Sequence, residues 1–96
     1  MSVDFTSIRN HNEEAVCAAV REHAPRYPGL AHDDGLLADV ACVALNRLQP
    51  RYIRHAVDFA FYVSDEERGE GDRRIVDAVE FAFGFVQART AMRARG

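Results

Sequence analysis

The feature that most constrains the fold of this chain is a densely apolar segment between Asp33 and Pro50. Its apolar residues are Leu36, Leu37, Val40, Ala41, Val43, Ala44, Leu45 and Leu48. On a helix they cover nearly the whole circumference, and such a helix must be buried on most sides. Asp33 or Asp34 is expected to cap it, and Pro50 to stop it. Because a chain of 96 residues has a small core, the residues that bury this helix are expected to come from the other helices of the chain or from a second subunit.

An earlier helix is predicted from Asn10, a residue type that caps helices well. Glu13 follows three positions later, as in a capping box. The apolar face of this helix consists of Ala15, Val16, Ala19 and Val20. Pro25 and the Tyr-Pro-Gly segment 27–29 then break it, because proline cannot continue a helix.

A final helix is predicted after Ser64, which forms an S-x-x-E capping box with Glu67. Its apolar face consists of Ile75, Val76, Val79, Ala82, Phe83 and Val86. Gly69 and Gly71 each cost about 1 kcal/mol relative to alanine inside a helix, so we expect fraying or a break there. The arginines of the tail 89–95 are expected to complement the negative end of the helix dipole.

Residues 52–63 show a different pattern, in which apolar residues alternate with a period near two. The alternating set is Ile53, Val57, Phe59, Phe61 and Val63. This favours a strand, while a helical stripe of Tyr52, Ala56, Phe59 and Val63 is the alternative. A lone strand must pair, and the economical partner is the same segment in a second copy. We therefore predict a mainly α-helical fold with three main helices and one short β segment, with pairing across a homodimer as a hypothesis.

Composition and patterning exclude several classes of protein. The net charge of −3 argues against a protein that coats nucleic-acid polymers, because those usually present a basic face. The start of the chain lacks a signal-peptide pattern and no window resembles a membrane span, so we expect a cytoplasmic protein without a membrane partner. We expect one domain over 1–96, with flexible ends at 1–8 and 91–96. Cys17 and Cys42 lie in apolar patterns without CxxC spacing, and we expect both to be small buried side chains.

The densest group of polar side chains lies where the apolar helix ends and the extended segment begins. It consists of Asn46, Arg47, Arg51, Tyr52, Arg54, His55 and Asp58. Arginine binds phosphate or a guanine edge, tyrosine and histidine stack on bases, and aspartate accepts hydrogen bonds from base N–H groups. The set therefore suits a nucleotide. The alternative is that Arg51 and Arg54 are solvated or paired with Asp58 and nearby Glu residues, while Tyr52 packs in the core.

Patterns typical of catalysis or of metal binding are missing from the sequence. GxSxG, P-loop, GxGxxG and HExxH motifs do not occur. His23, His32 and the Asp33-Asp34 pair match no established zinc spacing, so we expect no metal site and no cofactor. His55 is a single histidine on an apolar face, where a structural role is commoner than general-base catalysis. The chain is therefore not expected to be an enzyme.

The segment from Asp39 to Tyr52, DVACVALNRLQPRY, resembles the core motif of the late competence protein ComFB family. The spacing of Asn10, Glu13 and Val16 is also similar to an N-terminal element of that family, and the resemblance covers most of the chain. One departure is Gln49, where the family usually has the first proline of a pair. Some relatives bind zinc through extra cysteines near the first interhelix loop, and this chain has none there.

The resemblance implies a small, dimeric, non-enzymatic signalling protein that acts as a receptor for cyclic dinucleotides. The ligand would be cyclic di-GMP or cyclic di-AMP, and the regulated process competence, type IV pili or motility, through an unidentified downstream protein. On the motif, the resemblance assigns Asn46, Pro50, Arg51 and Tyr52 to the site, and Asp39 to a structural or dimer position. Residues Arg54, His55 and Asp58 are added from the residue types themselves. A ligand-free dimeric adaptor for other proteins is the alternative function.

Overall fold

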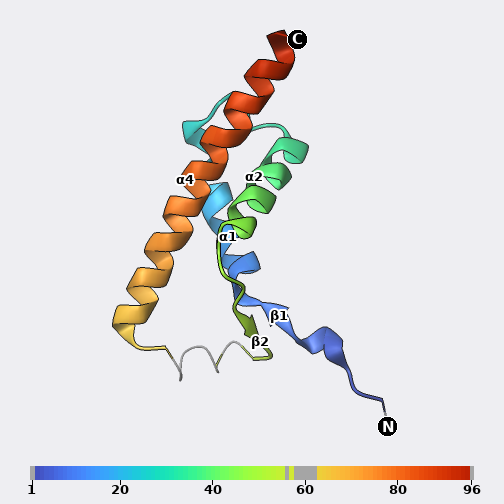
Figure 1. The fold of residues 1–96 in the computed structure, drawn as a ribbon, viewed down its shortest axis with the longest axis vertical. Helices are drawn as coiled ribbons and strands as arrows, with labels where there is room; N and C mark the ends of the chain where they lie inside the picture. The colour runs from blue at the N-terminus through green and yellow to red at the C-terminus, as the bar shows by residue number, and fades with distance from the viewer. Residues whose placement is uncertain (1, 56, 58–62, 96) are drawn as a thin grey trace.

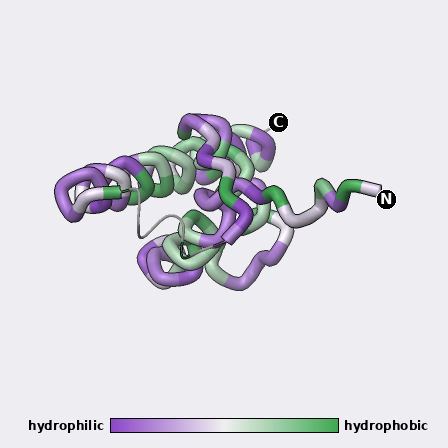
Figure 2. The backbone as a smooth tube through the Cα atoms, turned by 90° about the horizontal axis from the view of Figure 1, so that it is seen from below, coloured by the Kyte–Doolittle hydropathy of each residue, from purple (hydrophilic) through white to green (hydrophobic). Residues whose placement is uncertain are grey.

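The structure is a computed structural model that describes residues 2–55, 57 and 63–95. Within these residues the fold is mainly helical, with three helices and a short antiparallel pair of strands, as predicted (Figure 1). The helices are α1 (His11–His23), α2 (Asp34–Asn46) and α4 (Asp65–Arg95), and the strands are β1 (Arg9–Asn10) and β2 (Tyr52–Ile53). Single 3-10 turns form at Phe5–Ser7 and Ala24–Arg26. The segment before β1 extends away from the helices in both views (Figures 1 and 2).

Helix α1 begins and ends where the sequence predicts. The side chain of Asn10 accepts a hydrogen bond from the backbone N–H of Asn12, which satisfies one of the free amides of the first turn. The helix ends at His23, and a 3-10 turn that contains Pro25 follows it. Tyr27 then packs its ring against Phe83 of α4, with centroids 4.3 Å apart and planes 4° from parallel.

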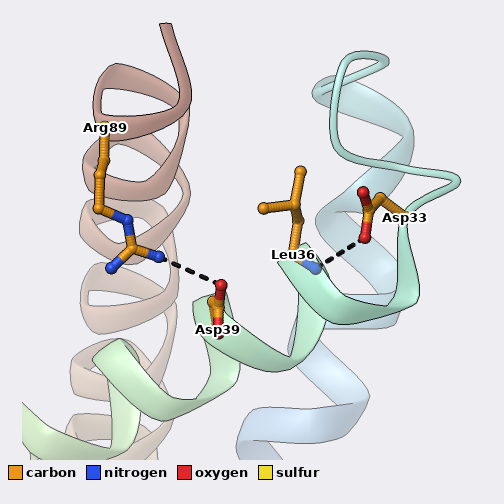
Figure 3. Close-up of polar contacts among 4 residues, drawn as sticks. All are labelled: Asp33, Leu36, Asp39 and Arg89. Carbon is orange, nitrogen blue, oxygen red and sulfur yellow. Dashed lines mark hydrogen bonds and ion pairs between the residues drawn. The ribbon is translucent and has the colours of Figure 1, made fainter. Parts of the chain in front are cut away.

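Helix α2 also starts as predicted, because Asp33 accepts a hydrogen bond from the N–H of Leu36 at 3.0 Å (Figure 3). Its burial differs from the prediction. Only Val40 and Ala44 are fully buried, and most of the other apolar side chains are half-buried. Cys42, predicted to be buried, is exposed, while Cys17 of α1 is half-buried. The reason is that α1 and α4 of the same chain cover one side of α2 and leave the other side to solvent.

Helix α4 is continuous through Gly69 and Gly71, so the predicted break is wrong. The cap at Ser64 holds its start, because the Ser64 hydroxyl accepts a hydrogen bond from the N–H of Glu67 at 3.1 Å. The core holds its middle through five buried residues: Ala78, Val79, Ala82, Phe83 and Val86. A local cost of about 1 kcal/mol per glycine is not enough to break a helix that is fixed on both sides. Val76, predicted on the apolar face, is exposed.

The core lies where α1, α2 and α4 meet. Its buried residues from the first two helices are Val16, Val20, Val40 and Ala44. Together with the buried stripe of α4 they remove part of the apolar surface of each helix from water, which is the main force that holds such a small fold together. The first turns of α4 lie beyond this core and are strongly hydrophilic (Figure 2).

Strand β2 confirms an extended conformation for the first residues of the segment 52–63, and its partner lies in the same chain. The register pairs Arg9 with Ile53 and Asn10 with Tyr52. Strand β1 could not be predicted from the sequence, because a two-residue strand has no measurable periodicity. Pairing across a dimer stays a prediction. Val57, predicted in the strand, is helical instead, and residues 56 and 58–62 of the predicted strand lie outside the described residues.

Candidate functional site

A pocket of about 750 Å³ lies between the loop that follows α2 and the first half of α4. Three arginines line it: Arg47 and Arg51 from the loop, and Arg74 from α4. Asn12 of α1 and Asp77 of α4 add further polar groups, and Leu48, Ile75 and Ala78 supply apolar surface. The pocket therefore joins cationic groups to a partly apolar wall, a combination that suits an anionic ligand with a flat, weakly polar part.

The loop 47–51 is held in place by the junction between β1 and α1. The Asn10 side-chain oxygen that caps α1 also accepts a hydrogen bond from the backbone N–H of Arg51 at 2.9 Å. Next to it, the buried side chain of Asn12 donates to the carbonyl of Gln49 at 2.8 Å. The carbonyl of Arg51 in turn accepts from the N–H of His11. These contacts fix the backbone of the loop, so its arginines are presented from a rigid support.

The charge around the pocket is opposite to that of the whole chain. The chain has a net charge of −3, whereas Asp77 is the one acidic residue beside three arginines among the described residues of the pocket lining. Arg74 forms an ion pair with Glu70 one helical turn away, at 3.8 Å, but both side chains are largely exposed. Such a surface pair contributes little, so a phosphate can replace Glu70 at low cost.

The predicted site residues are only partly brought together. Arg51 lines the pocket, and Asn46 lies at the end of α2, where its amide contacts the sulfur of Cys42 at 3.8 Å. Tyr52 in β2 is 67% exposed, so the alternative in which it packs in the core is wrong. The remaining predicted residues of the described chain, Arg54 and His55, are exposed and do not line the pocket. Asp58 lies outside the described residues.

Sequence reasoning missed the wall of the pocket that α4 provides. Arg74 and Asp77 lie on the polar side of a helix, where they have the same pattern as ordinary solvated residues. Asn12 was also missed, although a polar residue within an apolar helical face is a signal of a buried hydrogen bond. The loop and α4 are far apart in the chain, so no local sequence pattern indicates that these residues are close in space.

Asp39, assigned a structural or dimer position, forms an ion pair with Arg89 at 3.2 Å (Figure 3). The pair links α2 to α4, so Arg89 does more than complement the helix dipole as predicted. Its guanidinium also lies 5.7 Å from the ring centroid of Phe85. Both ionic side chains are partly exposed, which gives the pair a structural role at the surface between the two helices.

No three His, Cys, Asp or Glu side chains within the described ranges gather closely enough to hold a metal ion. None of the helices in the described part of the chain combines the length and the hydropathy that a membrane crossing requires.

Comparison with known proteins gives one match. The family model of the late competence development protein ComFB matches residues 9–90, from β1 to near the end of α4. No curated protein and no solved structure matches the chain. The matched range contains the loop 47–51, both walls of the pocket and the Asn10 junction, and it confirms the resemblance seen in the sequence. This chain therefore belongs to the ComFB family, and its membership indicates a role related to competence.

Proposed function

We propose that this protein is a receptor for a cyclic dinucleotide, with cyclic di-GMP favoured over cyclic di-AMP. It has no chemistry of its own and acts as a cytoplasmic homodimer. Ligand binding changes the surface that the dimer presents to a downstream protein, and so regulates competence, type IV pili or motility.

The observation that carries this proposal is the basic pocket at the loop 47–51. Within an acidic chain, Arg47, Arg51 and Arg74 face one cavity that also has an apolar wall. Guanidinium groups bind phosphate oxygens through paired N–H donors, and the apolar wall offers a surface for a base. The loop is also the part of the chain that carries the family motif.

The homodimer is supported by apolar surface that the single chain leaves uncovered. Several leucines of α2 are only half-buried, and Phe85 of α4 is 46% exposed. A second copy that covers this surface would remove it from water and bring two pockets into a symmetric arrangement. A cyclic dinucleotide has two equivalent halves, which suits a site with two-fold symmetry.

Isothermal titration with cyclic di-GMP, cyclic di-AMP and linear GMP tests the proposal. We expect micromolar or tighter binding of one cyclic ligand, and a loss of at least about tenfold in Arg51→Ala and in Arg74→Ala. Arg93→Ala, on the far end of α4, is the matched control and should bind like the wild type.

The variant Arg54→Ala distinguishes a ligand site that spans the dimer from a ligand site within each subunit. Arg54 does not line the pocket of the single chain. A loss of binding in Arg54→Ala would therefore place the ligand across the dimer, in contact with both copies of the segment after β2. Unchanged binding would confine the ligand to the pocket of each subunit.

The alternative function is a ligand-free adaptor, and the exposed aromatic residues of α4 favour it, because such surface often marks a protein interface. The absence of heat with all three nucleotides, together with an unchanged melting temperature, would contradict the receptor and support the adaptor.

A further inference from the structure

The guanidinium of Arg47, which belongs to the pocket lining, stacks on an aromatic ring. Its central carbon lies 3.7 Å from the centroid of the Phe81 ring, which is van der Waals contact. Phe81 lies on α4, next to the pocket wall formed by Asp77 and Ala78, and is 43% exposed. Arg47 therefore belongs both to the pocket lining and to a stack that links α2 to α4.

The stack leaves the binding capacity of the guanidinium unused. One face of its plane is covered by the ring, while the opposite face and the N–H donors at its edge stay available. Among the described residues no acceptor receives a hydrogen bond from the Arg47 side chain. The backbone N–H of Arg47 is bonded to the carbonyls of Ala44 and Leu45, so its stem starts from a fixed point at the end of α2.

A planar cation held in this way is preorganised for a planar ligand. A base that packs on the exposed face of the Arg47 guanidinium would complete a three-layer stack of ring, guanidinium and base. The restriction of the arginine rotamer has then already occurred in the free protein, so less conformational entropy is lost on binding. Arg51 and Arg74 line the same cavity and add two further guanidinium groups to it.

We propose that the stack of Arg47 on Phe81 is the platform on which the pocket holds a nucleobase, with the phosphates of the ligand toward Arg51 and Arg74. This assignment rests on the proposed function and names the base-binding part of that site. Arg47 contacts the base, and Phe81 is a positioning residue that acts through Arg47.

The platform has a consequence for ligand choice. Every base has a π face, so stacking by itself accepts guanine and adenine alike. Discrimination between cyclic di-GMP and cyclic di-AMP must then come from groups at the base edge, and Asp77 is the acidic acceptor among the described residues of the pocket lining. Loss of the platform should therefore weaken both cyclic ligands by similar factors.

Two substitutions test whether Arg47 acts as a stacking platform or only as a positive charge. Arg47→Lys keeps the charge and removes the plane, and Phe81→Leu keeps an apolar side chain and removes the ring. Phe5→Leu is the matched control, because it makes the same change at an exposed ring in the 3-10 turn before β1, which does not line the pocket. Phe81→Tyr restores a ring at the original position.

The experiment is titration of these four variants with cyclic di-GMP and cyclic di-AMP, with circular dichroism to verify folding. Arg47→Lys and Phe81→Leu are expected to bind both ligands about tenfold more weakly. Phe5→Leu should match the wild type, and Phe81→Tyr should recover most of the lost affinity. A cyclic dinucleotide that carries 2-aminopurine gives a second readout, because its fluorescence falls when the base stacks, and this quenching should disappear in Arg47→Lys.

The outcomes distinguish this inference from the function on which it rests. If the wild type binds neither cyclic ligand, the receptor proposal fails and the platform with it. If the wild type binds while Arg47→Lys and Phe81→Leu bind equally well with full quenching, the platform is overturned and the receptor stands. Because Arg47 is exposed, Arg47→Lys should fold, so it decides the question even if Phe81→Leu is destabilised.

Discussion

The side-chain oxygen of Asn10 has two structural roles. It caps α1 through the N–H of Asn12 and also accepts from the N–H of Arg51. The start of the first helix and the loop of the pocket therefore depend on the same side chain.

We expect Asn10→Ala to lower the free energy of unfolding by about 1–2 kcal/mol, because it removes a cap and a second acceptor. Asn10→Asp is the matched control, since a carboxylate oxygen can accept both hydrogen bonds. Urea denaturation of the two variants measures the difference. Equal stability of Asn10→Ala and the wild type would contradict the double role of this side chain.

The carboxyl group of Asp4 offers a test of the turn before β1. Hydrogen bonds from the Thr6 side chain and then from its backbone N–H lower the pKa of Asp4. The ionised form is favoured in the fold, so the turn is most stable above the pKa of the unfolded state and loses this support as pH falls through the folded value. Thr6→Ala should raise the pKa of Asp4, as followed by NMR during a pH titration.

At the scale of the elements, α4 shows how packing overrides local propensity. A Cβ atom added at Gly69 would have nothing within 4 Å, so alanine there is sterically free. We expect Gly69→Ala to raise the free energy of unfolding by about 1 kcal/mol. Gly35→Ala is the contrasting variant, because its Cβ would lie 3.3 Å from the capping oxygen of Asp33. Thermal unfolding should show a higher melting temperature for Gly69→Ala and a smaller gain or a loss for Gly35→Ala.

The ion pair of Asp39 and Arg89 joins α2 to α4 at the surface. A double-mutant cycle with Asp39→Ala, Arg89→Ala and both together should give a coupling of about 0.5–1 kcal/mol, because the two side chains are partly exposed. The coupling should decrease in 1 M salt, where screening is strong. A coupling that is unchanged by salt would show that the two residues interact through packing instead.

At the scale of the whole molecule, the central question is what covers the uncovered side of α2 and α4. Phe85 and Val76 are both exposed on α4, but they are nine positions apart, which at 3.6 residues per turn puts them on opposite sides of the helix. If a second copy covers the side of Phe85, then Phe85→Glu should convert a dimer into a monomer in sedimentation velocity. Val76→Glu should leave the dimer intact. A monomeric wild type would refute the homodimer directly.

The sequence determined the local features of this protein. The caps at Asn10, Asp33 and Ser64 and the stop near Pro25 were predictable, because each depends on contacts within a few residues along the chain. The family was also readable from the segment 39–52, and the mainly helical class follows from periodicity. The helix break at Gly69 was not correct, because its outcome depends on how firmly the rest of α4 is packed.

Only the tertiary structure decided the pocket and the partner of β2. Arg74 and Asp77 face the loop because α4 packs against α2 in one register. The local sequence around these residues does not predict that register. The strand Arg9–Asn10 is too short to show a period, and the stack of Arg47 on Phe81 joins residues that are far apart in the chain. Local hydrogen bonds and periodicity define where elements begin and end, whereas a site built between elements depends on how the core brings their faces together.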